Sequence, residues 1–382
     1  MRDRVTATSE ARCFNSWLEI DLGAIEHNVR AVREFVGPAT QVMAILKADG
    51  YGHGAIPVAG AVARAGATWL GVASALEGAQ LREAGIETPI LVLGAGFPEQ
   101  AGEVVRYGLS QTVANGEVPE ALSRAAAQAG VQVGVQIKVD TGMGRLGIMP
   151  DEAATFARRL LALPGLRLEG VFSHLATAEE EDPAYALGQL ARFQQALQGL
   201  QESGVQAPLR HIANSAGVVN FRQMHLDLVR PGLLAYGIAP GCKNMPLRLR
   251  PALTWKSRLA FVKRVPKGTS LSYGRTYITV RETTIATVPV GYADGYCRVL
   301  SNRGALLVRG RPFPVAGRVC MDHILLDMGD EPNVRVGEEV VLIGWQEGAG
   351  ITANEVASGQ GTVVHEVVAR LGKRLPRLYL DS

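Results

Sequence analysis

The sequence predicts an α/β fold, an N-terminal (β/α)8 TIM-type barrel over residues 15–245, followed by a mainly β domain over residues 246–382. From residue 42 onward, short apolar or β-branched runs alternate about eight times with alanine-rich segments of helical spacing. Near Pro251 the pattern changes to β-rich runs divided by tight turns. A chain of 382 residues also exceeds the usual size of one hydrophobic core. Residues 1–14 are expected to return to the β domain.

The barrel elements follow from the spacing of apolar residues. The expected strands are 42–46, 68–73, 89–93, 110–113, 133–139, 167–172, 210–212 and 226–229, with helices at 55–65, 117–128, 151–163 and 185–202. A half-buried strand at 17–21 and a helix at 23–35 precede them. An open doubly wound sheet is the alternative, but no G-x-G-x-x-G follows an early strand.

The β domain is read from its turn residues. Expected strand regions are 254–265, 283–290, 305–308, 315–327 and 339–343, with no long helix before 362–371.

Composition excludes several classes of protein. The net charge of +3 is too balanced to indicate nucleic-acid or anionic-membrane binding. The four cysteines lie far apart without C-x-x-C spacing, so neither a metal site nor a disulfide framework is expected. Residues 1–13 lack the apolar core of a secretory signal, and no apolar run approaches about 20 residues. We therefore expect a cytoplasmic protein that acts on a small molecule.

The stretch after the first barrel strand is the strongest chemical signal. The apolar run 42–46 stops at Lys47, and three glycines then alternate with Tyr51 and His53. A lysine at the end of a buried strand is partly desolvated, which lowers its pKa and makes its amine a nucleophile. The glycines permit a sharp turn and close approach to a ligand. An ordinary strand-to-helix turn with an exposed lysine is the alternative interpretation.

Polar residues follow other predicted strands in the same way. Lys138 to Arg145 follow the fifth strand, His174 the sixth, Asn214-Ser215 the seventh and Arg230-Pro231-Gly232 the eighth. In a barrel the carboxyl ends of the strands share one face, so these clusters should converge on one pocket. Each alone could be a capping or turn residue.

This residue set suggests an imine-forming lysine beside a bound phosphate. It contains neither a carboxylate pair nor a Ser/His/Asp arrangement. Pyridoxal 5'-phosphate fits, because a lysine attaches this cofactor and the cofactor acts as an electron sink. A lysine-dependent aldolase is the alternative, although its lysine would be expected on a later strand.

The segment Lys-Ala-Asp-Gly-Tyr-Gly-His-Gly at residues 47–54 resembles the cofactor-attachment motif of the alanine racemase family, a fold-type III group of pyridoxal-phosphate enzymes. The resemblance continues through His174 and segments 138–147, 211–216, 229–232, 272–274, 290–295 and 317–322. It implies an isomerase that interconverts L- and D-alanine by two-base proton transfer and supplies D-alanine for peptidoglycan of the cell wall. It also implies a homodimer with shared active sites.

The resemblance assigns roles residue by residue. Lys47 would attach the cofactor and serve as the base on the D side, and Tyr273 of the partner subunit as the base on the L side. Arg230 would bond the pyridine nitrogen, and Arg145 the phenolic oxygen and the substrate carboxylate. The remaining cofactor-binding positions would be Tyr51, His174, Asn214, Ser215, Gly232 and Leu233, and Tyr292 and Met321 would close the substrate pocket.

Three positions bear on variation within the family. Some members carry a carbamylated lysine at the position of Lys138. Many have a tyrosine where Lys373 precedes Arg-Leu-Pro-Arg, and His365-Glu366 stands where Tyr-Glu is common. We expect neither departure to change the reaction.

Alternative functions remain open at the level of sequence. A same-fold racemase of serine or other small amino acids would share every motif. A pyridoxal-phosphate decarboxylase is disfavoured, because decarboxylation benefits from an acidic partner at the pyridine nitrogen, where Arg230 is expected. A non-catalytic cofactor carrier on a single barrel would not need the β domain. Without the resemblance, Tyr273 and Tyr292 would be interpreted as turn and packing aromatics, and His211 as a structural histidine.

Overall fold

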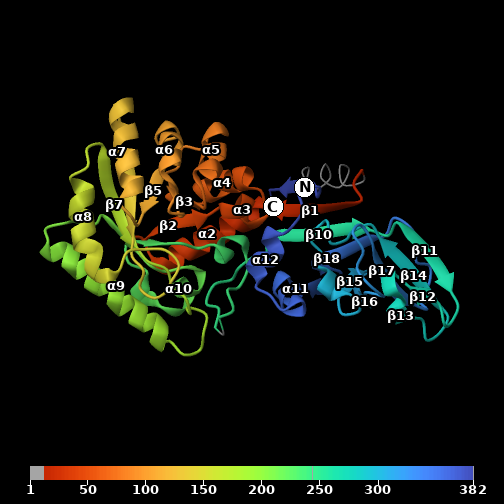
Figure 1. Ribbon diagram of the computed structural model, residues 1–382. Helices are drawn as coiled ribbons and strands as arrows, with labels where there is room; N and C mark the ends of the chain where they lie inside the picture. The colour runs from red at the N-terminus through yellow and green to blue at the C-terminus, as the bar shows by residue number, and fades with distance from the viewer. Residues whose placement is uncertain (1–12, 243, 382) are drawn as a thin grey trace. The chain divides into compact units, whose positions relative to one another are not determined.

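The computed structural model describes residues 13–242 and 244–381, and their contacts divide them into two compact units (Figure 1). One unit comprises Ile25–Gly50 and Ala55–Arg250. The other contains the described residues before Ile25, the short segment Tyr51–Gly54 and the described chain from Pro251 onward. Residues 1–12, part of the N-terminal stretch expected to join the β domain, lie outside the described residues.

The first unit is the predicted barrel, an eight-stranded parallel sheet with spatial order β8-β7-β6-β5-β4-β3-β2-β9. Its strands are β2 (Gln41–Ile45), β3 (Trp69–Val72), β4 (Ile90–Val92), β5 (Ser110–Val113), β6 (Val133–Lys138), β7 (Leu166–Phe172), β8 (Leu209–His211) and β9 (Leu228–Val229). Apart from the first residue of β2, the start of β7 and the middle of β8, these strands are buried, as expected for parallel strands covered on both faces.

The ends of this sheet approach each other at β8 and β9. The Asp227 N–H donates to the Arg210 carbonyl oxygen at 3.1 Å, and the Arg230 N–H donates to that of Ala213 at 3.0 Å. These bonds link the last strand to its neighbour and bring the sheet close to full closure. The predicted (β/α)8 architecture is confirmed.

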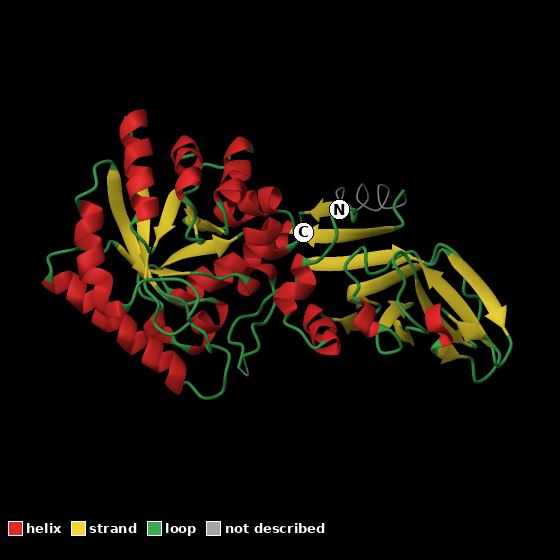
Figure 2. Cartoon of the chain, in the orientation of Figure 1, coloured by secondary structure: helices red, strands yellow, loops and turns green. Residues whose placement is uncertain are grey.

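Helices surround the barrel strands, as Figure 2 shows. They are α2 (Leu22–Val36), α4 (Ala55–Arg64), α5 (Ala75–Glu83), α6 (Ala101–Arg106), α7 (Glu117–Ala129), α8 (Ala153–Leu161), α9 (Ala184–Glu202) and α10 (Ser215–Asn220). The alanine-rich spacing predicted α4, α7, α8 and α9. It missed α5, α6 and α10.

The second unit is mainly β, as predicted. Its largest sheet has seven strands in the order β16-β15-β18-β10-β1-β20, with β19 paired to β18. The strands are β1 (Ser16–Asp21), β10 (Leu253–Arg258), β15 (Ala305–Val308), β16 (Arg311–Pro314), β18 (Glu339–Gln346), β19 (Ala349–Ile351) and β20 (Arg377–Leu380). Smaller sheets contain β11 (Phe261–Val265), β14 (Thr283–Val288) and β17 (Ile324–Gly329), and β12 (Ser270–Leu271) and β13 (Tyr277–Ile278).

The first strand differs from its expected place. The sequence boundary put residues 15–21 in the barrel, whereas β1 pairs antiparallel with β10 and parallel with β20 in the seven-stranded sheet. Trp17 and Leu18 are buried there. The alternating pattern predicted a strand correctly but carries no information about which sheet it joins.

The segment Tyr51–Gly54 packs tightly within the second unit. A Cβ on Gly52 would lie 2.1 Å from the Val368 carbonyl oxygen, and one on Gly54 would lie 1.9 Å from the Tyr379 hydroxyl. Both glycines also have positive φ, so close approach and backbone conformation together explain why they stand here.

Two helices of the second unit are α11 (Ala353–Gln360) and α12 (Val364–Ala369). The sequence analysis predicted α12 and missed α11, although Thr352 and Glu355 form a capping box at its start. Across residues 13–242 and 244–381, every helix is too short or too polar to cross a bilayer.

Candidate active site

The candidate groups of the barrel follow the carboxyl ends of its strands. Lys138 is the last residue of β6, and Arg230 follows β9 directly. Lys47 lies two residues beyond β2, and His174 two beyond β7. In a parallel barrel these ends form one rim, where active sites of this fold lie.

Arg230 is the most connected of these groups. Its buried guanidinium donates to the carbonyl oxygens of Ser173 and Ile212 at 2.7 and 3.0 Å. It also donates to Nδ1 of His211 at 2.7 Å and lies 3.2 Å from Nδ1 of His174. Burial lowers its pKa to about 9, which still leaves it charged near neutral pH.

The contacts of His211 determine its tautomer. Nδ1 accepts from Arg230, so Nε2 carries the hydrogen and donates to the Gln136 side-chain oxygen at 2.8 Å. The ring also stacks on Phe172, with centroids 4.8 Å apart. Burial, then the charges of Arg230 and Lys138, hold the pKa of His211 well below its ordinary value.

Lys138 is a buried amine, and its Nζ has no hydrogen-bond partner among residues 13–242 and 244–381. Nζ lies over the Phe172 ring, 4.6 Å from the centroid. Burial, followed by Arg230 and Arg145, brings the pKa of Lys138 well below its ordinary value. The lowered pKa increases the fraction of this amine that is unprotonated.

Lys47 and His174 share this environment. Burial lowers the pKa of Lys47. The charges of Arg145 and Arg230 lower it further, and the charge of Glu77 raises it. Burial and four cations bring the pKa of His174 well below its ordinary value. Mutual repulsion among these groups makes the rim favourable for an anionic ligand.

The loop that carries Arg145 is shaped by one carboxylate. Asp140 Oδ1 accepts the N–H groups of Gly142, Met143 and Gly144 at 2.9, 2.9 and 3.1 Å. Burial raises the pKa of the Asp140 carboxyl, but these hydrogen bonds lower it by more. The loop thereby brings an exposed Arg145 within electrostatic reach of Lys47 and Lys138.

The last two strand ends meet through Ser215. Its Oγ accepts the Gly232 N–H at 2.9 Å and the Leu234 N–H at 3.4 Å. Leu233 is buried at the start of the short 3-10 helix Leu233–Tyr236. Asn214 caps α10 by accepting the Gly217 N–H at 2.9 Å, so its side chain is occupied as a helix cap.

The residues after Lys47 turn back on themselves. Ala48, Asp49 and Gly50 have φ of 54°, 54° and 60°, all left-handed. Tyr51 follows with φ 53°, is buried, and burial raises its pKa to about 12.

His365 and Lys373, the two positions at which the sequence departs from the family pattern, differ in their relation to Tyr51. The His365 ring contacts the Tyr51 ring edge-on, with centroids 5.5 Å apart. Lys373 is exposed. His365 is therefore the residue found at the Tyr51 ring.

The expected residues of the second unit are exposed at loop ends. The exposed fractions of Tyr273, Tyr292 and Met321 are 69%, 43% and 53%. Tyr292 donates its N–H to the Cys320 carbonyl oxygen at 3.1 Å, which ties the loop of Tyr292 to that of Met321. Ser272 Oγ donates to the Arg318 carbonyl oxygen at 2.5 Å, which ties Tyr273 to the same loop.

Arg374 fastens two of these loops. Its Nε donates to Asp294 Oδ1 at 2.7 Å, and Nη2 donates to Asp322 Oδ1 at 2.7 Å. Asp294 Oδ2 also accepts the Gly291 N–H at 2.9 Å. The three expected side chains therefore come from one connected set of loops in this unit.

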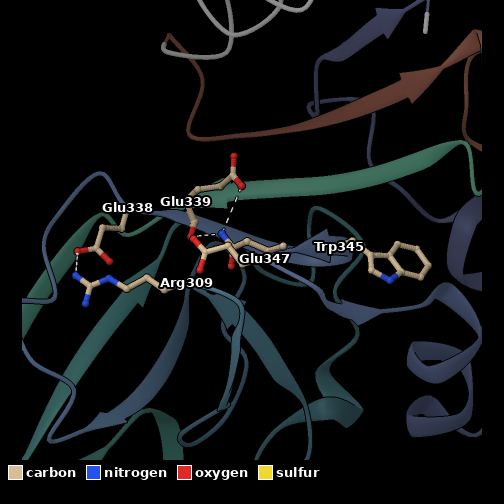
Figure 3. A pocket seen from close by; sticks show the side chains of 6 residues that line it. Arg309, Glu338, Glu339, Trp345 and Glu347 are labelled. Carbon is tan, nitrogen blue, oxygen red and sulfur yellow. Dashed lines mark hydrogen bonds and ion pairs between the residues drawn. The ribbon is translucent and has the colours of Figure 1, made fainter.

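A separate surface pocket of about 520 Å³ lies entirely in the second unit (Figure 3). Its lining residues are Arg309, Glu338, Glu339, Trp345, Gln346 and Glu347. Arg309 pairs with Glu338 at 2.6 Å, and Glu339 pairs with Lys256 at 3.2 Å. Both ion pairs join neighbouring segments of the sheet.

Among the described residues no group of histidines, cysteines and carboxylates is arranged to hold a metal ion.

Comparisons with known proteins decide the family. Residues 20–240 match the model described as alanine racemase, N-terminal domain, and residues 252–379 the model described as alanine racemase, C-terminal domain. The alanine racemase of Halothermothrix orenii is 46% identical over 96% of this chain and 97% of its own. That of Symbiobacterium thermophilum is 48% identical over 95% and 97%. The chain belongs to the alanine racemase family.

Solved structures agree with this membership. Alanine racemase from Streptomyces lavendulae superposes with a TM-score of 0.91 at 39% identity, covering 96% of this chain and 97% of that one. Alanine racemase from Bacillus anthracis, solved with bound L-Ala-P, gives 0.91 at 37% identity, covering 96% and 95%. The predicted fold and the predicted enzyme class, a racemase of this family, are confirmed.

Sequence reasoning missed several residues that surround the candidate groups. Gln136 and Phe172 lie in β6 and β7 and surround the expected lysine, arginine and histidines. His211, interpreted as structural, bonds Arg230 directly. Its place as the last residue of β8 was a usable signal, because polar groups at the ends of several other strands had been counted.

The lowered pKa of His211 predicts a pH effect on stability. Because folded His211 resists protonation, stability should fall as pH drops through about 6.5, where the unfolded chain takes up the proton. Between pH 7.5 and 5.5 this histidine should contribute a loss of up to about 1.4 kcal/mol. Urea unfolding should show His211→Asn losing that much less than the wild type. Equal losses in both proteins would contradict the lowered pKa.

Proposed function

We propose that this protein interconverts L- and D-alanine with pyridoxal 5'-phosphate as cofactor, acts in the cytoplasm and supplies D-alanine for peptidoglycan. The observation that carries the proposal is the cationic rim, where Arg145 and Arg230 lower the pKa values of Lys47 and Lys138, and all four cations lower that of His174. Such a rim suits an anionic phosphate-bearing cofactor together with the carboxylate of an amino acid. The Bacillus anthracis relative was solved with L-Ala-P.

The residues at the rim fit the cofactor end by end. Lys47 would attach it covalently. Ser215 and the backbone N–H groups of Gly232 and Leu233 would hold the phosphate, with Tyr51 from the turn after Lys47. When bound, the cofactor supplies an electron sink for charge that develops at the substrate Cα.

The middle and far end of the cofactor would meet Arg145, His174 and Arg230. His174 would pack against the ring, and Arg145 would contact the phenolic oxygen. Asn214 would contribute by fixing the start of α10, which begins with Ser215.

Arg230 would control the pyridine nitrogen. A guanidinium that stays charged donates hydrogen bonds, so the pyridine nitrogen opposite it must remain an acceptor. His211 and Gln136 hold that guanidinium in place through a fixed tautomer. This arrangement weakens the electron sink, which favours proton transfer alone and disfavours an amino-acid decarboxylase.

Two bases on opposite sides would move the α-proton. The lowered pKa of Lys47 raises the fraction of neutral amine, which accepts or returns the proton on the D side. Tyr273 would serve the L side from the partner subunit of a homodimer, because its side chain is 69% exposed on a loop of the second unit. Tyr292 and the backbone of Met321 would close the substrate pocket, and Arg145 would bind the carboxylate. Serine and other small amino acids are the alternative substrates.

Lys138 would be carbamylated in this enzyme. Its Nζ, in the unprotonated form that a lowered pKa favours, would attack the carbon of CO2, one C–O π bond would break, a proton would pass to water, and an N-carboxylate would remain. The new anion would lie within electrostatic reach of Arg145 and Arg230 and orient Arg145.

The modification predicts a carbamate signal in the protein supplied with 13C-bicarbonate. Carbon-13 NMR should show a protein carbamate resonance that disappears in Lys138→Met. Lys256→Met is the matched control. Although burial lowers the pKa of Lys256, Glu19 and Glu339 raise it, so its amine stays charged and unreactive. A resonance that survives in Lys138→Met would exclude Lys138.

The attachment role of Lys47 predicts a spectral change. Purified wild-type protein should show the visible absorbance of a lysine-linked cofactor, and Lys47→Ala should lack that band. Lys138→Met should keep it. An unchanged band in Lys47→Ala would refute the cofactor assignment.

The two-base assignment predicts asymmetric loss of proton exchange. Tyr273→Phe should suppress solvent exchange of the α-proton of L-alanine by about 100-fold or more, and that of D-alanine far less. NMR in D2O measures both rates, and Tyr292→Phe is a control on a neighbouring loop. Equal suppression in both directions by Tyr273→Phe would count against two separate bases.

A further inference from the structure

The backbone that follows Lys47 adopts an unfavourable conformation. Ala48 (φ 54°, ψ 49°) and Asp49 (φ 54°, ψ 51°) are left-handed although neither is glycine. A left-handed residue with a side chain costs free energy, because its Cβ crowds the following carbonyl oxygen. Such a turn persists only where surrounding contacts hold it.

One carboxylate supplies the contact at the start of this turn. Glu77 Oε1 accepts the Ala48 N–H at 2.8 Å, and Glu77 Oε2 accepts the Ala73 N–H at 2.6 Å. Ala73 follows β3, the parallel neighbour of β2, which ends just before Lys47. Glu77 therefore bridges the carboxyl ends of two adjacent strands, one of which leads into the lysine.

Glu77 is itself fixed at the start of α5. Its N–H donates to the Ser74 Oγ at 3.3 Å, where Ser74 is the N-cap of the helix. The other end of the turn is held separately, since Asp49 Oδ1 accepts the Ala55 N–H at 2.8 Å. The side of the turn next to Lys47 is thus held by Glu77, together with the Gly50 N–H, which donates to the Leu46 carbonyl oxygen at 2.7 Å.

The charge of Glu77 also acts on Lys47. Among the groups that shift the lysine pKa, Arg145 and Arg230 are cations that lower it, and Glu77 raises it. His174 faces the same group, and Lys47 lowers the pKa of that histidine. Glu77 thus counteracts part of the repulsion on the amine.

We propose that Glu77 is a positioning residue for Lys47: it holds the start of the left-handed turn that directs the lysine and places a carboxylate near its amine. This role rests on the proposed function for its catalytic consequence only. This positioning role requires both the hydrogen bonds to Ala48 and Ala73 and the negative charge of Glu77. A variant that loses either one should therefore differ measurably from the wild type.

Two variants separate these contributions. Glu77→Gln keeps the shape and one acceptor oxygen but removes the charge, and Glu77→Ala removes both acceptors. Glu83→Gln is the matched control, because Glu83 ends the same helix and accepts the Tyr107 hydroxyl. Melting temperatures identify any variant that fails to fold, and Glu77→Gln is the variant expected to remain folded.

The first measurement is independent of activity. Hydrogen exchange of the peptide spanning residues 46–52 should become about tenfold faster in Glu77→Ala and stay unchanged in Glu83→Gln. The second measurement is the rate of acylation of Lys47 as a function of pH. It uses the full chain after hydroxylamine has removed the cofactor. Without the Glu77 charge the lysine pKa falls, so the midpoint in Glu77→Gln should move down by about 0.5 pH unit or more.

Racemisation supplies the third measurement. Glu77→Gln should lower kcat about tenfold with little change in KM, because the lysine is misdirected and the substrate contacts remain. The proposal would be overturned if folded Glu77 variants showed unchanged hydrogen exchange and an unchanged pH midpoint of Lys47 acylation. A lower melting temperature with no change in that midpoint would also overturn it. If the wild type fails to racemise alanine, the proposed function fails, and the exchange and acylation data still decide the role of Glu77.

Discussion

The contacts of Arg230 connect the closure of the barrel to its chemistry. Its backbone N–H bonds Ala213 where the last strand meets β8, and its guanidinium spans the ends of β7 and β8 through Ser173, Ile212 and His211. A buried guanidinium is stable only when hydrogen-bond acceptors such as these three offset its loss of hydration. The barrel therefore cannot place Arg230 correctly unless these strand ends are in register, and the site forms as the sheet closes.

The same cation influences the titration of the groups around it. After burial, its charge lowers the pKa values of His174, His211 and Lys138, and it contributes to the lowered pKa of Lys47. Amines and histidines with lowered pKa values beside a fixed cationic donor are suited to accept a proton. One carboxylate opposes this effect at each lysine, Glu77 at Lys47 and Asp140 at Lys138.

Sequence alone predicted the groups that end strands, because a polar residue after a buried apolar run is visible in one chain. It predicted the barrel, the β domain, Lys47, Lys138, His174 and Arg230 as members of one rim. It did not identify Glu77, whose role depends on a hydrogen bond from Ala48, 29 residues earlier in the sequence. Nor could it place β1, because an alternating strand pattern does not specify its partner. His365 beside Tyr51 is a similar case of a contact that spacing does not encode.

The central claim is that the two bases come from different chains, Lys47 from a barrel and Tyr273 from the second unit of its partner. Mixing Lys47→Ala with Tyr273→Phe under conditions of subunit exchange tests it most directly. Each variant alone should be nearly inactive. In a statistical mixture half of the dimers contain both chains and one of their two sites is intact, so racemase activity should recover to about a quarter of wild type. A mixture that stays inactive, although mass spectrometry shows mixed dimers, would contradict the account.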